Sequence, residues 1–429
     1  MSGTKSAARR PDVSLPSHIY RRLFETRRLS LDLAAPLSPE DMTVQAMPDA
    51  SPTKWHLAHT TWFFETFILT PYLPDYGIFD EAFGFCFNSY YEAVGARQPR
   101  AYRGLLTRPT SEQVFAYRAH VDEALDRLLS GPAADAVSGL IEVGINHEQQ
   151  HQELLLTDIL ALFAANPLRP AYLSVARNLP TVSATEMRWI DYAGGIHDVG
   201  ATGDTFAWDN EEPRHAALIR PFRLADRLVT NSEWLQFMQD GGYRTAAHWL
   251  ADGWTLVQSE GWRSPLYWEG SGSVWHEMSL NGLLPLDLAA PVSHVSYYEA
   301  DAYARWSGKR LPTEFEWEIA SAGQPVTGND LSTRALRPVA AARTAGAGPQ
   351  QLFGDVWEWT QSAYLPYPGY APAEGALGEY NGKFMVGQHV LRGASCVTPS
   401  GHARATYRNF FHPQQRWQFT GVRLASEID

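Results

Sequence analysis

Apolar residues recur at helical spacing in four long segments of the first 165 residues. The expected helices cover residues 17–34, 52–69, 110–129 and 134–165, and the second should end before Pro71. The third helix begins at a capping box, because Thr110 and Gln113 stand three residues apart. A long connection of about residues 72–109 precedes it. This pattern predicts a four-helix bundle.

The pattern changes after Pro167, where glycine, proline and tryptophan become frequent and short strands and turns replace long helices. Three further capping boxes predict short helices, at Thr230 to Glu233, Ser296 to Glu299 and Thr313 to Glu316. We therefore expect an α+β protein with a domain boundary near residues 170–186. The expected parts are a disordered tail at 1–14, a helical domain at 15–175 and a second domain at 186–429.

Composition narrows the possible partners of the 429-residue chain. The formal net charge is −12 and no basic run is present, which argues against nucleic acid or an anionic membrane as partner. No apolar stretch reaches 18 residues and the N-terminus has no apolar core of a signal peptide, so we expect a cytoplasmic protein. Two separated cysteines, Cys86 and Cys396, exclude a disulfide framework. The sequence leaves the oligomeric state open.

A metal site is the strongest chemical signal. His147 and His151 stand at i and i+4, so their imidazoles share one helix face. A third imidazole can come from His56 or His59 on the second expected helix. Three neutral imidazoles with vacant positions suit zinc hydrolysis or non-haem iron chemistry. The carboxylates that compete as ligands are those of Glu65, Glu148 and Glu153.

Gln150 lies three residues after His147 and therefore near the same helix face. Its amide suits a substrate carboxylate. It equally suits a role in orienting a ligand histidine.

Several motifs resemble two known families. Residues 51–65 and 147–151 resemble the DinB-like domain of ergothioneine sulfoxide synthases. The second half resembles the formylglycine-generating-enzyme domain, also called the sulfatase-modifying-factor domain, which has a C-type-lectin-like fold. The motifs that carry this likeness are residues 229–233, 291–296, 308–314, 354–360, 392–395 and 421–423. The resemblance covers roughly residues 15–427, and the two domains in this order are specific for the synthases.

The resemblance implies an Fe(II) enzyme of ergothioneine biosynthesis that uses O2 as co-substrate. Such enzymes join a thiol sulfur to C2 of the imidazole of N-α-trimethylhistidine, called hercynine, and give a sulfoxide. Their three iron ligands correspond to His59, His147 and His151, which favours His59 over His56. Formylglycine-generating activity is not expected, because it needs a cysteine pair for copper.

The resemblance also assigns the organic part of the site. One branch of the family carries a tyrosine pair that corresponds to Tyr90 and Tyr91, the expected proton or electron donors, whereas the mycobacterial-type branch takes its tyrosine from the C-terminal domain. In the substrate loop, Asn409 would bind hercynine together with Gln150. The faces of Phe410 and Phe411 would meet the trimethylammonium group, a contact of about 0.5–2 kcal/mol. The second substrate is a thiol or selenol donor.

The resemblance does not assign the sulfur donor as directly as it assigns hercynine. Arg100 and Arg103 match an Arg-x-x-Arg motif that binds the donor carboxylates in relatives, although a structural arginine face would look the same. The acid that follows the asparagine in the mycobacterial-type loop is absent, and Gln414 and Gln415 displace the next arginine. These changes favour L-cysteine over γ-glutamylcysteine.

Three alternatives remain open. The first is a selenoneine synthase, which takes a selenosugar and forms a C–Se bond. A sugar donor needs neutral hydrogen-bonding groups, whereas cysteine needs charged partners. The others are a non-catalytic ligand-binding protein and a zinc-dependent thiol transferase of the DinB-like type.

Overall fold

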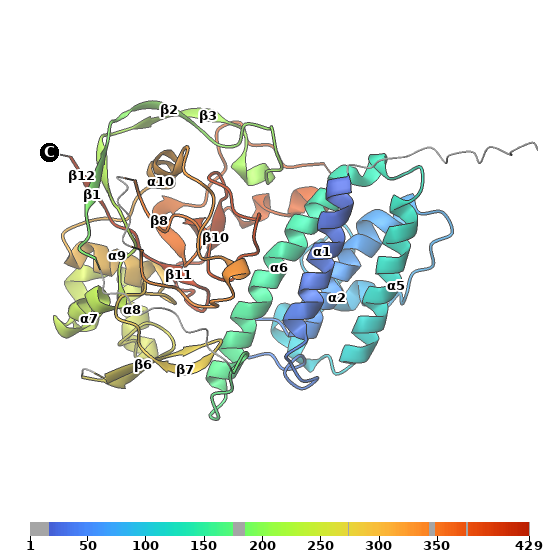
Figure 1. Ribbon diagram of the computed structural model, residues 1–429, viewed down its shortest axis with the longest axis horizontal. Helices are drawn as coiled ribbons and strands as arrows, with labels where there is room; N and C mark the ends of the chain where they lie inside the picture. The colour runs from blue at the N-terminus through green and yellow to red at the C-terminus, as the bar shows by residue number, and fades with distance from the viewer. Residues whose placement is uncertain (1–16, 175–184, 273, 343–347, 375, 429) are drawn as a thin grey trace, which may run out of the picture.

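The structure is a computed structural model that describes residues 17–428 except 175–184, 273, 343–347 and 375. The tail expected at residues 1–14 and most of the boundary expected at 170–186 lie outside the described residues. The last helix of the first half ends at Ala165 and the first strand begins at Trp189 (Figure 1). Within the described chain, no helix is both long and apolar enough to span a bilayer.

Four long helices form the bundle of the first half (Figure 1). They are α1 (Ser17–Ala34), α2 (Thr53–Phe64), α5 (Ser111–Leu129) and α6 (Ser138–Ala165). The capping box at Thr110 and Gln113 is present, and all four predicted helices are confirmed. The long connection is partly helical, with α4 (Phe83–Phe87) and the 3₁₀ helix η2 (Arg100–Leu105).

The predicted end of the second helix is wrong. A π-helical turn, η1 (Glu65–Leu69), follows α2, and α3 (Thr70–Tyr72) continues the chain past Pro71. Pro71 lies in the first turn of α3, where a missing N–H costs no hydrogen bond. The proline therefore begins a new turn instead of ending the old one.

The helix α2 is the centre of the bundle, because all twelve of its residues are buried. A glycine brings it close to α6: a Cβ on Gly144 would lie 2.5 Å from the ring of Phe64. Any larger residue at position 144 would push the two helices apart. This close approach matters because His147 follows one turn later on α6, where it faces His59 on α2.

The second half combines four small sheets with short helices. The sheets have the orders β1-β4-β12, β10-β9-β8-β11, β2-β3 and β5-β6-β7, and only β11 pairs with its neighbour β8 in parallel among the named strands. In chain order the strands are β1 (Trp189–Tyr192), β2 (Gly195–Val199), β3 (His215–Ile219), β4 (Phe222–Ala225), β5 (Trp268–Ser271), β6 (Val274–Ser279), β7 (Gly282–Pro285), β8 (Trp357–Ala363), β9 (His389–Gly393), β10 (Asn409–Phe411), β11 (Thr420–Gly421) and β12 (Ala425–Glu427).

The three predicted capping boxes begin α7 (Asn231–Gln239), α9 (Tyr297–Trp306) and α10 (Glu314–Ser321). The helix α8 (Ala251–Glu260) was not predicted, because its first turn receives no side-chain cap from Leu250. Arg392 is fully buried and donates to Glu314 and Glu318 at 2.9 Å each, which explains its motif as a fold determinant.

The helix α6 joins the two halves, and it runs along their boundary in Figure 1. Glu153 on this helix accepts hydrogen bonds from three side chains of the second half. The donors are Trp357 Nε1 at 2.7 Å, Ser395 Oγ at 2.6 Å and Thr398 Oγ1 at 2.7 Å. Burial nevertheless raises the pKa of the Glu153 carboxyl. These bonds fix the rotation of α6 against the second half.

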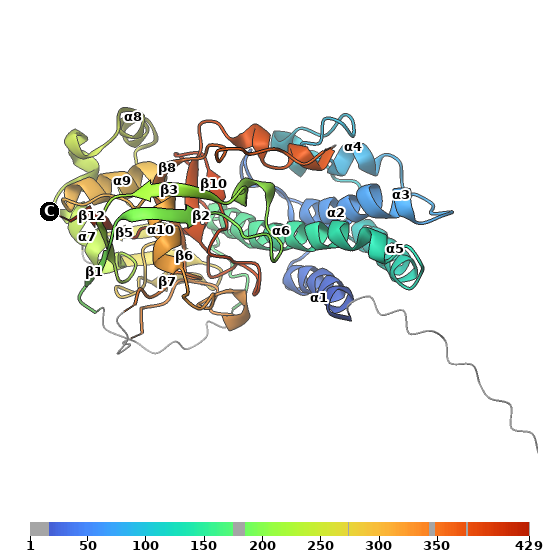
Figure 2. The same cartoon turned by 90° about the horizontal axis from the view of Figure 1, so that it is seen from above.

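A second connection is the segment 376–388, which we call the strap. It contains the 3₁₀ turns η8 (Ala376–Glu379) and η9 (Gly382–Phe384). Figure 2 shows this orange-red segment reaching from the second half across the bundle beside α4. It therefore covers the place where the two halves meet.

Candidate active site

Three histidines form a compact group between α2 and α6. One ring nitrogen from each of His59, His147 and His151 lies within 4.8 Å of the others. Nε2 of His59 lies 3.1 Å from Nε2 of His147. Within the described part of the chain, no other group of three such residues has this geometry. The structure thus brings together the three histidines that the resemblance selected.

The three competing carboxylates have other partners. Glu65 accepts from the hydroxyls of Tyr76 and Tyr117 at 2.7 and 2.5 Å. Glu148 forms buried ion pairs with arginines of α1 and α5, namely Arg27 and Arg118. Glu153 binds the second half, as described above. None of the three belongs to the histidine group.

The histidines have the protonation state that a metal ion needs. Burial lowers the pKa of His147 to about 3, and it also lowers the pKa of His59 and of His151 well below the ordinary value. All three are therefore neutral near pH 7 and offer lone pairs. Nδ1 of His59 lies 2.6 Å from the carbonyl oxygen of Phe87, to which it donates, and this leaves Nε2 for a ligand. The residues fit a divalent metal ion with open positions.

His56 supports this group instead of joining it. Its Nδ1 lies 2.9 Å from Nδ1 of His151, and its Nε2 lies 3.0 Å from Oδ2 of Asp158. The other oxygen of Asp158 accepts from Trp417 Nε1 at 3.2 Å. A chain of hydrogen bonds therefore runs from the second half through Asp158 and His56 to His151. Such a chain orients the ring of a metal ligand.

We expect the substitution Asp158→Asn to weaken binding of a divalent metal ion by roughly 10–100-fold, because the orienting charge behind His56 is lost. The affinity is measured by anaerobic Fe(II) titration. Asp252→Asn, an exposed change on α8, serves as the control. Wild-type affinity in Asp158→Asn would refute the orienting role.

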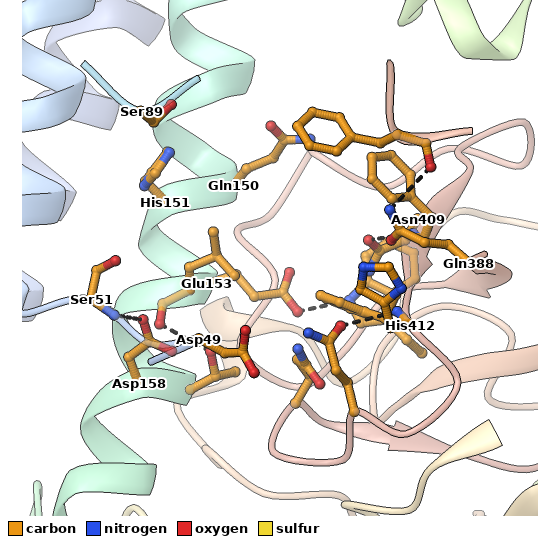
Figure 3. Close-up of a pocket in the computed structure, with 18 of the residues that line it drawn as sticks. Asp49, Ser51, Ser89, Gln150, His151, Glu153, Asp158, Gln388, Asn409 and His412 are labelled. Carbon is orange, nitrogen blue, oxygen red and sulfur yellow. Dashed lines mark hydrogen bonds between the residues drawn. The ribbon is translucent and has the colours of Figure 1, made fainter. Parts of the chain in front are cut away.

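A cavity of about 290 Å³ opens next to the histidine group. Residues from both halves line it, and Figure 3 shows α6 with His151, Gln150, Glu153 and Asp158 on one side and Asn409, Gln388 and His412 on the other. Of the predicted site residues, it is lined by Tyr90, Arg100, Arg103, Gln150, His151, Asn409, Phe410 and Phe411. His59, His147 and Tyr91 are buried behind its wall.

Gln150 is already held by two tyrosines of the second half. Its amide nitrogen donates to the hydroxyl of Tyr407 at 2.6 Å, and its oxygen accepts from the hydroxyl of Tyr380. The second N–H of the amide is the part of Gln150 that remains for a ligand. Asn409 is fixed as well, since its oxygen accepts from the backbone N–H of Phe410 at 2.9 Å.

The two predicted tyrosines have different surroundings. Tyr90 lines the cavity and stacks on Tyr91 with ring centroids 4.7 Å apart. Tyr91 is fully buried and packs on Trp62 and Phe67. Burial raises the pKa of both phenols above the ordinary value, so both carry their protons at neutral pH. The geometry gives Tyr90 the direct contact with the cavity.

The prediction from sequence missed Tyr380 on the strap. Its ring lies parallel to that of Trp208 at 4.4 Å and edge-on to His147 at 5.8 Å. It also approaches the ring of Tyr90 to 5.9 Å, and burial raises its pKa well above the ordinary value. A third phenol thus reaches the same wall. The signal that could have pointed to Tyr380 is that the mycobacterial-type branch takes its tyrosine from the C-terminal domain.

The arginines also differ. Arg103 is buried, donates to Ser51 Oγ at 2.9 Å and lies 3.4 Å from the ring centre of Trp55. Arg100 is exposed and also lines the cavity. Both positions allow contact with an anionic group in the cavity.

Comparisons with known proteins match both halves. Residues 22–155 match the DinB superfamily, and residues 175–333 and 325–428 match the sulfatase-modifying factor enzyme 1-like domain. A hercynine oxygenase from Mycolicibacterium thermoresistibile is 33% identical over 97% of this chain and 97% of its own length. A second, from Mycobacterium tuberculosis, is 34% identical over 96% of this chain and 99% of its own length. The chain belongs to the hercynine oxygenase family, the ergothioneine sulfoxide synthases.

Membership in the hercynine oxygenase family makes the chain an oxidoreductase with a role in ergothioneine biosynthesis. The α+β fold, with a DinB-like bundle before a C-type-lectin-like domain, is confirmed. A formylglycine-generating enzyme from Streptomyces coelicolor is 28% identical over 55% of this chain and 88% of its own length. Cys86 and Cys396 are free and lie in different halves of the chain. These two cysteines therefore do not form the pair that binds copper in formylglycine-generating enzymes.

In this hercynine oxygenase family member, two charged residues fasten the strap to the loop that carries Tyr90 and Tyr91. Glu379 accepts from the backbone N–H groups of Glu92 and Ala93 at 3.0 and 2.9 Å. Lys383 donates to the carbonyl oxygen of Tyr90 and pairs with Glu379 at 2.8 Å. These bonds hold the pKa of Glu379 at about 2. The strap therefore sets the position of Tyr90 from the outside.

We expect Glu379→Gln to lower kcat about two- to fivefold, the range of an exposed ion pair, and to leave the metal content unchanged. Hydrogen exchange should be faster in residues 88–95. The effect should be smaller at high salt, where the wild-type pair is already screened. Lys383→Arg retains the charge and should retain the rate. Unchanged exchange in Glu379→Gln would contradict this account.

Proposed function

We propose that the protein is an Fe(II)- and O2-dependent enzyme that joins the sulfur of a small thiol to C2 of the hercynine imidazole and gives a hercynine sulfoxide. One oxygen atom of O2 becomes the sulfoxide oxygen. The other leaves as water with the thiol proton and the C2 proton, so atoms and electrons balance. The observation that carries the proposal is the neutral group of His59, His147 and His151 beside a cavity built by both halves.

The histidines would hold the iron, which when bound supplies open positions for O2 and a thiolate. The residues around it do the positioning. Gln150, already oriented by Tyr380 and Tyr407, presents its remaining N–H to the hercynine carboxylate. Asn409 faces the cavity from the opposite wall (Figure 3).

The cationic end of hercynine suits an aromatic wall. Phe410 lines the cavity and is held by its stack on Tyr364, with ring centroids 4.1 Å apart. Phe411 lines the same wall and lies near Trp417. Aromatic faces attract a quaternary ammonium group without a counter-ion.

The phenols that line the cavity, those of Tyr90 and Tyr380, are the groups assigned to proton transfer. Tyr90 and Tyr380 keep their protons at neutral pH, because burial raises the pKa of each. Each can therefore deliver a proton to an oxygen atom in the cavity and recover it from solvent. Tyr91 supports the ring of Tyr90 through their stack.

L-Cysteine is the first candidate donor, with Arg100 and Arg103 for its carboxylate. A selenosugar is the second candidate, and one observation favours it: three neutral amides, those of Gln388, Gln415 and Gln418, line the cavity. Neutral amides are better hydrogen-bond partners for hydroxyl groups than for charged groups.

The test is anaerobic reconstitution with Fe(II), followed by O2, hercynine and one donor at a time, with products identified by mass spectrometry. L-Cysteine, γ-glutamylcysteine and a selenosugar are the donors. A hercynine sulfoxide supports the first candidate, and a selenium adduct alone supports the second. No hercynine product with any donor would refute the function. Zinc in the anaerobically purified protein would then favour a thiol transferase.

A further inference from the structure

The cavity extends along α6, because side chains of this helix from Gln150 to Asp158 line it. Asp158 follows His151 by seven residues, which is about 10 Å along a helix axis. Ser51 donates its backbone N–H to Asp158 at 2.8 Å, and Arg103 donates to the hydroxyl of Ser51 at 2.9 Å. We call this region, with Trp417 and Gln418 opposite, the Asp158 end. Gln150 marks the other end, where hercynine is proposed to bind.

The side chain of Gln418 has no explained role in the fold. The residue is 2% exposed and lines the cavity. Among the described residues, neither its amide nitrogen nor its amide oxygen has a hydrogen-bond partner. Its backbone is fixed, since the carbonyl oxygen accepts from the N–H of Thr420 at 2.8 Å. A buried amide with both atoms unpaired is costly, and this one borders the space where a ligand fits.

The neighbouring charges decide what Gln418 can bind. An ammonium group buried here would need an anionic partner. The carboxylate of Asp158 at this end already accepts from Ser51, His56 and Trp417. A carboxylate would instead go to Arg103, whose Nε is buried and unpaired among the described residues. A neutral group that both donates and accepts is the match for a carboxamide.

We propose that Gln418 binds a hydroxyl or amide group of the sulfur or selenium donor and thereby selects donors that carry such a group. This inference rests on the proposed function, because it assumes that the donor occupies the Asp158 end. L-Cysteine carries neither group, so its use as a donor does not depend on the side chain of Gln418. Gln418 is then a specificity determinant that touches the donor and leaves hercynine untouched.

The test compares wild type with Gln418→Met, which keeps the length of the side chain and removes its hydrogen bonds. The donors are 1-thio-β-D-glucose for hydroxyl groups, γ-glutamylcysteine for an amide and L-cysteine for neither. We expect kcat/KM for one of the first two to fall roughly 10–100-fold, with the KM of hercynine, the iron content and the rate with L-cysteine unchanged. The fall identifies which group is bound. Gln361→Met, exposed on β8, is the control.

Donor binding is also measured directly by calorimetry with each protein, without hercynine. If wild type makes no hercynine product but binds a donor that Gln418→Met does not bind, the proposed reaction fails and the role of Gln418 stands. The role is overturned if Gln418→Met binds and uses every donor as wild type does, or if wild type binds none of them. It is equally overturned if the variant loses activity with all three donors alike.

Discussion

Replacing His147 with alanine is expected to remove iron binding and turnover together. His147 faces His59 across the α2–α6 contact, with their Nε2 atoms 3.1 Å apart, and its loss leaves two imidazoles. Loss of one of three ligands should weaken Fe(II) binding more than the roughly 10–100-fold effect of a supporting residue. Iron per chain is measured after anaerobic reconstitution and desalting. The fold should survive, because the change removes a buried group that carries no charge at neutral pH.

His18→Ala, on the exposed face of α1, is the matched control and should retain iron and activity. Thermal unfolding of the apoproteins separates metal loss from misfolding. If His147→Ala retains one iron per chain with unchanged affinity, the metal centre lies elsewhere. His59→Ala and His151→Ala should behave as His147→Ala does, since all three ring nitrogens belong to one group.

The second large effect is expected from the phenols. Tyr90→Phe and Tyr380→Phe should each lower sulfoxide formation, and together they should lower kcat by roughly 10²–10⁴-fold, the usual contribution of acid–base catalysis. Phenylalanine keeps the stacks of Tyr90 on Tyr91 and of Tyr380 on Trp208 and removes only the hydroxyl groups. Iron content should therefore remain that of wild type. Tyr91→Phe should have a smaller effect, because Tyr91 lies behind the cavity wall.

Single-turnover product analysis and iron content are measured on the same samples. Tyr102→Phe, an exposed change, is the control. Unchanged turnover in the double variant would remove the phenols from the reaction. Loss of iron in it would show that they support the metal centre instead.

The helices were predictable because their signals are local. A capping box such as Thr110 with Gln113 needs only four consecutive residues, and all four predicted boxes are present. The metal ligands were partly predictable. Spacing alone pairs His147 with His151, but it cannot separate His56 from His59, since residues three apart share a helix face. The structure distinguishes the two histidines, because Asp158 on α6 binds His56 and leaves His59 to face the other two imidazoles.

The strap could not be read from spacing. Tyr380 meets Gln150 across 230 positions, and Lys383 meets Tyr90 across 293. No periodicity or capping rule links positions so distant in the chain. The helical pattern therefore indicated the histidines of α2 and α6, and the family resemblance supplied Asn409, Phe410 and Phe411. Neither pointed to the contacts that Tyr380 and Lys383 make from the strap. Gln418 could not be predicted from spacing either, because its amide is recognised as unpaired only when the residues that line the cavity have been placed.

The strap also fixes an order of events during synthesis. The bundle with its three histidines leaves the ribosome first, and the segment that covers it follows more than 200 residues later, since α6 ends at Ala165 and the strap begins at residue 376. At roughly 5–20 residues per second, an uncovered histidine group faces solvent for on the order of ten seconds or more. During that interval any divalent cation can enter without passing Tyr380. The metal is then selected by competition among the available divalent cations before the enzyme is complete, and the supply of the right cation at the ribosome becomes part of making an active molecule.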